Sequence, residues 1–181
     1  MKLFFTSVLC ALIFVSFSCS NNKDLSKYDN TRLPVGPLQY QALEDWDLGT
    51  PDNFMRLEQF QIQDNSELAV YFLPGEAGSV DANIARWKKQ FLANEARKVV
   101  FEKKYNYKSI PLTKIMIEGD YKEMVNPFDP SSEKKIKDSW AMFAVVAELE
   151  EGKWFFKALG PKEELLSSQE DIDEFVSTFR I

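Results

Sequence analysis

The sequence predicts an α+β domain, built on an antiparallel sheet of about five or six strands with helices packed on it. Short stretches rich in aromatic and β-branched residues recur along the 181-residue chain, with turn clusters between them. Two further segments, within 81–92 and 168–179, place their apolar residues at helical spacing. Strands that follow one another with helices set apart are typical of an α+β domain.

The first strands are expected between residues 37 and 73. Residues 37–43 can form a strand, and Trp46 follows in a turn-rich loop. Residues 54–62 and 67–73 have strand composition and are joined by the turn cluster QDNS. The second of these is apolar on both faces, which predicts a central position in a covered sheet.

A helix is expected after the break at 74–80. Asp81 can cap its N-terminus. Its apolar stripe consists of Ile84, Trp87, Phe91 and Leu92. Residues 95–108 continue as a charged helix or a loop.

The second half of the chain predicts a strand, a loop, a hairpin and a helix. Residues 110–121 form the strand, and the charged, proline-containing segment 125–138 forms the loop. Residues 140–149 and 154–159 are the buried strands of the hairpin. Ser168, with Asp171 three residues on, resembles a capping box. The apolar stripe of that last helix consists of Ile172, Phe175, Val176 and Phe179.

The first eighteen residues predict an export signal. Lys2 precedes an uncharged, mostly apolar run of about 15 residues, which is short of the roughly 20 that span a bilayer. Ser18-Cys19 resembles the end of a bacterial lipoprotein signal, although Ser16 departs from the usual leucine and only a relaxed motif is matched. Plain secretion, with small residues before Cys19, and an uncleaved anchor are the alternatives.

The cysteine count favours lipidation of Cys19. The other cysteine, Cys10, lies inside the signal, so processing leaves one cysteine with no intramolecular partner. Acyl chains such as palmitate would hold the protein on the cell membrane or the outer membrane. Residues 19–36 are polar and predict a flexible tether, which leaves 37–181 as a single domain.

Composition excludes several functional classes. Loss of Lys2 with the signal changes the formal net charge from −6 to −7, and an acidic chain is a poor partner for nucleic acid. The chain has no histidine, and with Cys19 acylated no thiol would be left as a ligand, so no metal and no cofactor are expected.

One group of polar residues is a candidate binding site. Gly75 and Gly78 precede the expected helix and could present backbone amides to an anion, or they could simply form a tight turn. Asn83, Arg86 and Lys157 could converge near this loop and bind a carboxylate or the backbone of a partner. The alternative for Arg86 is a structural one, in which it pairs with a carboxylate or with carbonyl groups at strand ends.

Catalytic patterns are absent from the sequence. No serine lies in a Gly-x-Ser-x-Gly elbow, and the segment 126–133 lacks the order of a calcium loop. Carboxylates are plentiful, but spacing alone selects no pair for acid–base chemistry. They are Glu118, Asp120, Glu123, Asp129, Glu148, Glu150 and Glu151.

Two stretches carry a resemblance to a known family. Residues 55–91 and 153–161 are similar to a family of uncharacterised bacterial lipoproteins known mainly from planctomycete-like organisms. The matching positions are Met55, Arg56, Leu57, Gly75, Gly78, Asn83, Arg86 and Trp87, followed by the KWFFKALGP segment. The layout also resembles the PsbP/Mog1-like α+β fold. The resemblance implies a shared fold and a surface location, and it implies no reaction.

The expected function is therefore that of a membrane-anchored envelope lipoprotein acting as a non-enzymatic binding or assembly module, with an envelope protein as partner. A carboxylate-dependent envelope hydrolase is the alternative. Two buried carboxylates facing each other in a deep cleft would favour the hydrolase, and a shallow face would favour the binding module.

Overall fold

The computed structural model describes residues 36–75, 78–124 and 131–181. The expected signal peptide, Cys19 and all of the expected tether except Gly36 lie outside these ranges. Among the described residues, no helix is long and apolar enough to span a bilayer.

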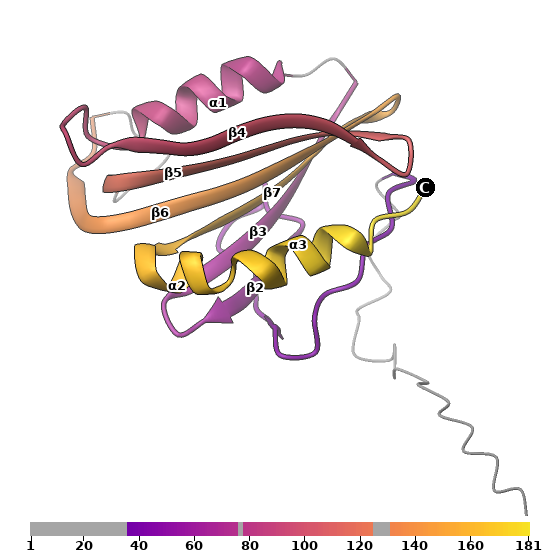
Figure 1. Ribbon diagram of the computed structural model, residues 1–181, viewed down its shortest axis with the longest axis horizontal. Coiled ribbons are helices and arrows are strands. Elements are labelled where there is room, and N and C mark those ends of the chain that lie inside the picture. Colours follow the sequence, from indigo (N-terminus) through magenta and orange to yellow (C-terminus); the bar gives the residue numbers. More distant parts are fainter. Residues whose placement is uncertain (1–35, 76–77, 125–130) are drawn as a thin grey trace, which may run out of the picture. The chain divides into compact units, whose positions relative to one another are not determined.

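The described domain is organised around a seven-stranded antiparallel sheet in the order β1-β2-β3-β7-β6-β5-β4 (Figure 1). The strand count exceeds the expected five or six. The pairing of β3 with β7 joins the N-terminal strands to the C-terminal hairpin, which consists of β6 and β7. The strands are β1 (Asp47–Leu48), β2 (Glu58–Gln63), β3 (Ser66–Pro74), β4 (Lys98–Tyr107), β5 (Ile110–Met124), β6 (Lys134–Leu149) and β7 (Gly152–Pro161).

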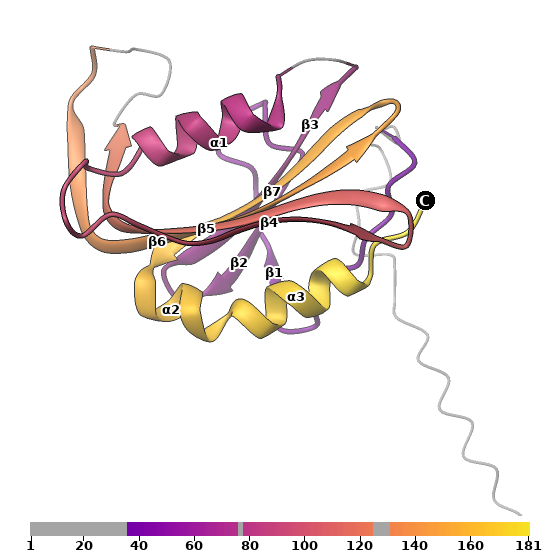
Figure 2. The same cartoon turned by 45° about the horizontal axis from the view of Figure 1, so that its top comes forward.

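Helices cover both faces of the sheet (Figure 2). Helix α1 (Val80–Lys89) lies on one face, which we call the α1 face. Helices α2 (Lys162–Ser167) and α3 (Gln169–Ser177) lie on the opposite face, which we call the α3 face. The α+β class expected from the sequence is therefore confirmed, as an antiparallel sheet with helices packed on it.

The core of the α3 face contains a cluster of aromatic side chains. All four apolar residues of the expected last helix are buried, although Phe179 lies beyond the end of α3 at Ser177. Phe156 of β7 lies 5.4 Å from Phe175 and 4.7 Å from Phe179, measured between ring centroids. Aromatic pairs at these centroid distances stabilise the fold beyond the contribution of the apolar area that they bury.

The core of the α1 face forms under one stripe of α1. Ile84, Trp87 and Phe91 are buried against β5, β6 and β7, as their spacing predicts, but Phe91 follows the end of the helix at Lys89, and Leu92, the fourth residue of the expected stripe, is only partly buried. Trp87 packs edge-on against Phe155 of β7, with 6.1 Å between ring centroids. The preceding residue, Arg86, is exposed on the flank of the helix.

The N-terminal segment differs from the prediction. Residues 37–43 form no strand, although Gln39 makes an isolated bridge to Arg180. Strand β2 begins at Glu58, so 54–57 belong to the preceding loop. The apolar residues of 37–46 cover the α3 face of the sheet, and that role requires no strand pairing.

The segment expected as a charged helix or loop at 95–108 is largely the edge strand β4. Its side chains are mostly exposed on both faces, so no alternation of apolar and polar residues marks it as a strand. The segment is a strand because it pairs with β5 along its whole length, although its hydrophobic pattern does not indicate one.

The expected loop at 125–138 is also partly wrong. Residues 125–130 lie outside the described part, but β6 already begins at Lys134 and pairs with the end of β5. The short helix α2 was not anticipated.

Both helix caps differ from the predictions. Ser79, not Asp81, caps α1, since its hydroxyl accepts a hydrogen bond from the amide of Ala82 at 3.0 Å. Ser168 precedes α3, but its hydroxyl donates to the carbonyl of Glu164 instead of capping the helix.

Candidate functional site

The candidate site is built around a lysine in the middle of the sheet. Along β7, Phe156 and Ala158 belong to the core of the α3 face, so Lys157 between them points to the α1 face. Its neighbours across the two adjacent strands are Ala69 and Ala144. Two small neighbours leave room for a long side chain to lie half-buried along the sheet.

Helix α1 supplies the second wall of the site. Asn83, Arg86 and Gln90 recur at helical spacing beside the buried stripe. The Lys157 ammonium donates to Oε1 of Gln90 at 3.2 Å, and the Arg86 guanidinium donates to Oδ1 of Asn83 at 2.6 Å. Asn83 is buried and is itself held by its amide, which donates to the carbonyl of Ser79 at 3.0 Å.

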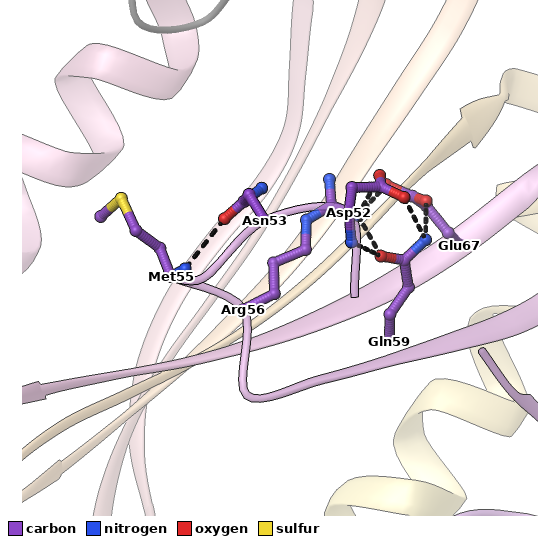
Figure 3. A network of polar contacts seen from close by, with 6 residues as sticks. All are labelled: Asp52, Asn53, Met55, Arg56, Gln59 and Glu67. Carbon is purple, nitrogen blue, oxygen red and sulfur yellow. Dashed lines mark hydrogen bonds and ion pairs between the residues drawn. The ribbon is translucent and has the colours of Figure 1, made fainter. Parts of the chain in front are cut away.

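The loop before β2 supplies a second arginine (Figure 3). Arg56 forms ion pairs with Asp52 at 2.9 Å and with Glu67 at 2.8 Å, and it donates to Oε1 of Gln59 at 2.7 Å. Gln59 in turn donates to Glu67 at 2.8 Å. Only 15% of the Arg56 side chain is exposed, so this arginine is fixed by both its charge partners and its packing.

The same loop is held by its backbone. The amide of Asp52 donates to Gln59 at 3.1 Å, and the amide of Met55 donates to the side chain of Asn53 at 3.0 Å. The amide of Arg56 donates to the carbonyl of Asn53 at 3.2 Å. The position of Arg56 is therefore set before any ligand arrives, which lowers the entropic cost of binding.

Electrostatics link the three cations. Burial, and then the positive charges of Arg56 and Arg86, lower the pKa of Lys157 to about 8, while Glu67 acts in the opposite direction. Burial also raises the pKa of the Tyr71 hydroxyl, and the positive charge of Arg56 acts in the opposite direction. We call Arg56, Arg86 and Lys157, with the polar side chains that hold them, the cationic cluster.

The cationic cluster is not fully neutralised. Glu67 is engaged by Arg56 and Gln59, and Asp52 is also paired with Arg56. Within the described ranges, neither Arg86 nor Lys157 has a carboxylate within ion-pair distance. The structural alternative for Arg86, pairing with a carboxylate, is therefore not what the described residues show.

The structure brings most of the sequence-predicted site residues together. Arg86 contacts Asn83, and Lys157 contacts Gln90 on the same helical segment, close enough for the charge of Arg86 to lower the pKa of Lys157. Gly78 is beside them, because a Cβ atom at that position would lie 3.1 Å from Nδ2 of Asn83. Gly75 lies elsewhere, in the turn beside Glu151, and its amide donates a hydrogen bond to the carbonyl of Glu151 at 2.8 Å. Both glycines have positive φ, as expected for a tight turn.

Several members of the cluster were not predicted as site residues. Arg56 matches only a family motif position in the sequence, and it reaches Glu67 because β2 and β3 pair in register. Gln90 lies one helical turn after Arg86, so the sequence alone places both residues on the same side of the helix. That Gln90 belongs to the site becomes apparent only once it is known which part of the sheet the helix covers.

The carboxylates named in the sequence analysis do not assemble into a second site. Glu118 is paired with Lys162 at 3.2 Å and lies near Lys98 at 4.0 Å. Asp129 lies outside the described residues. Among the residues the structure describes, no carboxylate belongs to the buried set, and no group of potential metal ligands occurs. A separate open hollow of about 360 Å³ lies between β4 and α3, lined by Lys103, Tyr105, Tyr107, Lys114, Asp173, Val176 and Ser177.

Comparisons with known proteins give only distant structural neighbours. No family model and no curated protein matches the chain. The solution structure of cyanobacterial PsbP (CyanoP) from Synechocystis sp. PCC 6803 is similar over 84% of this chain and 98% of its own, at 10% identity and a TM-score of 0.49. PA94, a protein of unknown function from Pseudomonas aeruginosa, is similar over 81% of this chain and 98% of its own, at 11% identity and a TM-score of 0.45. Similarity at this level assigns the chain to no family.

Proposed function

We propose that this protein is a lipid-anchored component of the bacterial envelope and that its folded domain is a non-enzymatic binding module. The binding face is the cationic cluster beside α1. The observation that carries the binding assignment is this group of three ordered cations, incompletely neutralised, in a chain whose formal net charge is −6. An anionic group on an envelope protein is the complementary partner.

The anchor rests on the sequence. The apolar run that ends at Cys19 and the polar segment after it support acylation and attachment through a tether to the cell membrane or the outer membrane. Membership of the planctomycete-type lipoprotein family and a PsbP/Mog1-like architecture belong to the same proposal. The antiparallel sheet covered by helices on both faces is compatible with that architecture.

Replacement of the anchor residue should move the protein between fractions. Cys19→Ser removes the thiol that would be acylated, so the variant should leave the membrane fraction and be recovered as a soluble exported protein. Wild type should remain with the membranes after washing in high salt, because acyl chains and not charges hold it. Mass spectrometry should find acyl chains on residue 19. An unmodified N-terminus at Cys19 would leave plain secretion as the correct interpretation.

The binding face can be tested by photo-crosslinking in intact cells. A photoreactive residue at Lys89, exposed on α1 beside Arg86, should give a discrete adduct with an envelope protein. The same residue at Glu163, on α2 at the opposite face, is the matched control and should give none. The adduct should be lost in Lys157→Met. Equal adducts from both positions, or an adduct unaffected by Lys157→Met, would contradict the assignment of the binding face.

No observation on the described residues favours the hydrolase alternative over the binding module. Among the described residues of the cationic cluster, both carboxylates, Asp52 and Glu67, are engaged by Arg56. A hydrolytic pair would need two carboxylates free to exchange protons and a water molecule.

A further inference from the structure

We propose that the cationic cluster binds a carboxylate group, held between the Lys157 ammonium and the Arg86 guanidinium, with Arg56 as a fixed positive charge behind them. This inference rests on the proposed binding function and names the chemistry of its ligand. It is carried by the unused hydrogen-bond donors of the cluster, by its charge balance and by its position on α1.

The two proposed ligand-holding side chains have donors to spare. An ammonium carries three N–H donors, and the structure assigns Lys157 one acceptor, Oε1 of Gln90. A guanidinium carries five, and among the described residues Arg86 has one acceptor, Oδ1 of Asn83. Asn83 and Gln90 each hold one of these two groups, so part of the ordering that a ligand would require is already in place.

The charge balance calls for a single negative charge. Three cations share two carboxylates, Asp52 and Glu67, and both of these are bound to Arg56. Even Arg56 retains an unsatisfied donor, because its buried Nε has no hydrogen-bond partner among the described residues. A monoanion would neutralise the surplus of one positive charge, whereas a dianion would leave one uncompensated negative charge beside Asp52 and Glu67.

The position of the cluster favours a carboxylate over a phosphate. Phosphate sites commonly use backbone amides at a helix N-terminus. Here the charges lie near the C-terminal half of α1, and the glycine turn at Gly75 is held by the carbonyl of Glu151. Arg86 is exposed and Lys157 half-buried, so a ligand would approach from solvent along the helix.

The test is a titration with sodium acetate, followed by two-dimensional ¹H–¹⁵N NMR. The protein is the chain from residue 19 onward with Cys19→Ser, at pH 6.5, where Lys157 carries its proton. Sodium chloride keeps the ionic strength constant, so that screening does not change during the titration. Acetamide, the neutral isostere, and inorganic phosphate are titrated in parallel.

The expected result is saturable movement of the Gln90 side-chain amide and of Arg86 Nε by acetate, with a Kd on the order of millimolar for so small a ligand. Acetamide should move neither signal. Arg86→Gln and Lys157→Met should each weaken acetate binding at least about tenfold, which corresponds to one charge-assisted contact of about 1.4 kcal/mol. Lys89→Met, an exposed cation on the same helix, should leave acetate binding unchanged.

Three results would overturn the proposal. One is linear, non-saturable shifts by acetate, which indicate an adventitious ion only. Another is equal acetate affinity in wild type and Lys157→Met. The third is tighter binding of phosphate than of acetate. Failure here leaves the proposed function separately testable, because the Lys89 photo-crosslink does not depend on which group the partner presents.

Discussion

Trp87→Ala is expected to destabilise the domain by about 3–5 kcal/mol, the range for removal of a buried aromatic side chain. Trp87 is 4% exposed and is the largest side chain that α1 contributes to the core of the α1 face. Its ring packs edge-on against Phe155 of β7. Truncation would leave a cavity between the helix and the centre of the sheet. Urea denaturation followed by circular dichroism measures the change in the free energy of unfolding.

The neighbouring residue provides the matched control. Arg86→Ala removes an exposed side chain, whose described contact is the hydrogen bond to Asn83. Its cost should be about 1 kcal/mol, the usual value for one such bond. Equal losses of stability in both variants would mean that α1 is held by Arg86 as much as by its apolar stripe, contrary to the packing described above.

Gly160→Ala is expected to cost about 3 kcal/mol through overpacking, although it adds only one methyl group. A Cβ atom at Gly160 would lie 1.9 Å from Oγ and 2.6 Å from Cβ of Ser66, and 2.8 Å from Leu165. Ser66 is fully buried, and its hydroxyl donates to Glu164 at 2.8 Å. Relief of the clash would displace β3 or α2 and weaken that bond.

A second glycine separates close packing from backbone strain. Gly75→Ala introduces a side chain at φ +60°, where a Cβ atom would have no neighbour within 4 Å. Its cost should be about 1 kcal/mol, from the left-handed conformation alone. Thermal melts of the two variants should therefore differ clearly, and a larger loss in Gly75→Ala than in Gly160→Ala would contradict the packing argument.

The sequence predicts those elements in which burial and periodicity coincide. The stripe of α3 and the buried parts of the two hairpin strands fall where expected, because each has one or two continuous apolar faces, whereas the exposed start of β6 at Lys134 was expected as a loop. Strand β4 was not recognised, since an edge strand exposed on both faces carries no hydrophobic pattern and depends on β5 for its pairing. The first predicted strand failed for the opposite reason, because apolar residues can cover a sheet without joining it.

Some residues of the cationic cluster could be predicted from the sequence in the same way. Lys157 is conspicuous in the sequence as a cation between apolar neighbours in a predicted strand, and Asn83 and Arg86 share a predicted helix face. Arg56 and Glu67 meet only because β2 pairs with β3, and Gln90 reaches Lys157 only because α1 lies over β7. Such contacts depend on topology, which local spacing does not encode.

The pKa of Lys157 is the most direct test of the cationic cluster. It can be measured by following the side-chain ¹³Cε and ¹⁵Nζ signals of Lys157 as a function of pH, with the exposed Lys89 as an internal reference. We expect a value of about 8, because the ammonium is desolvated and lies near two arginines, and among the described residues no carboxylate is within ion-pair distance of it, although Glu67 acts to raise the pKa. A value near 10.5, the ordinary value for lysine, would mean that this charge is solvated or already neutralised, and it would remove the basis for an anion site on this face.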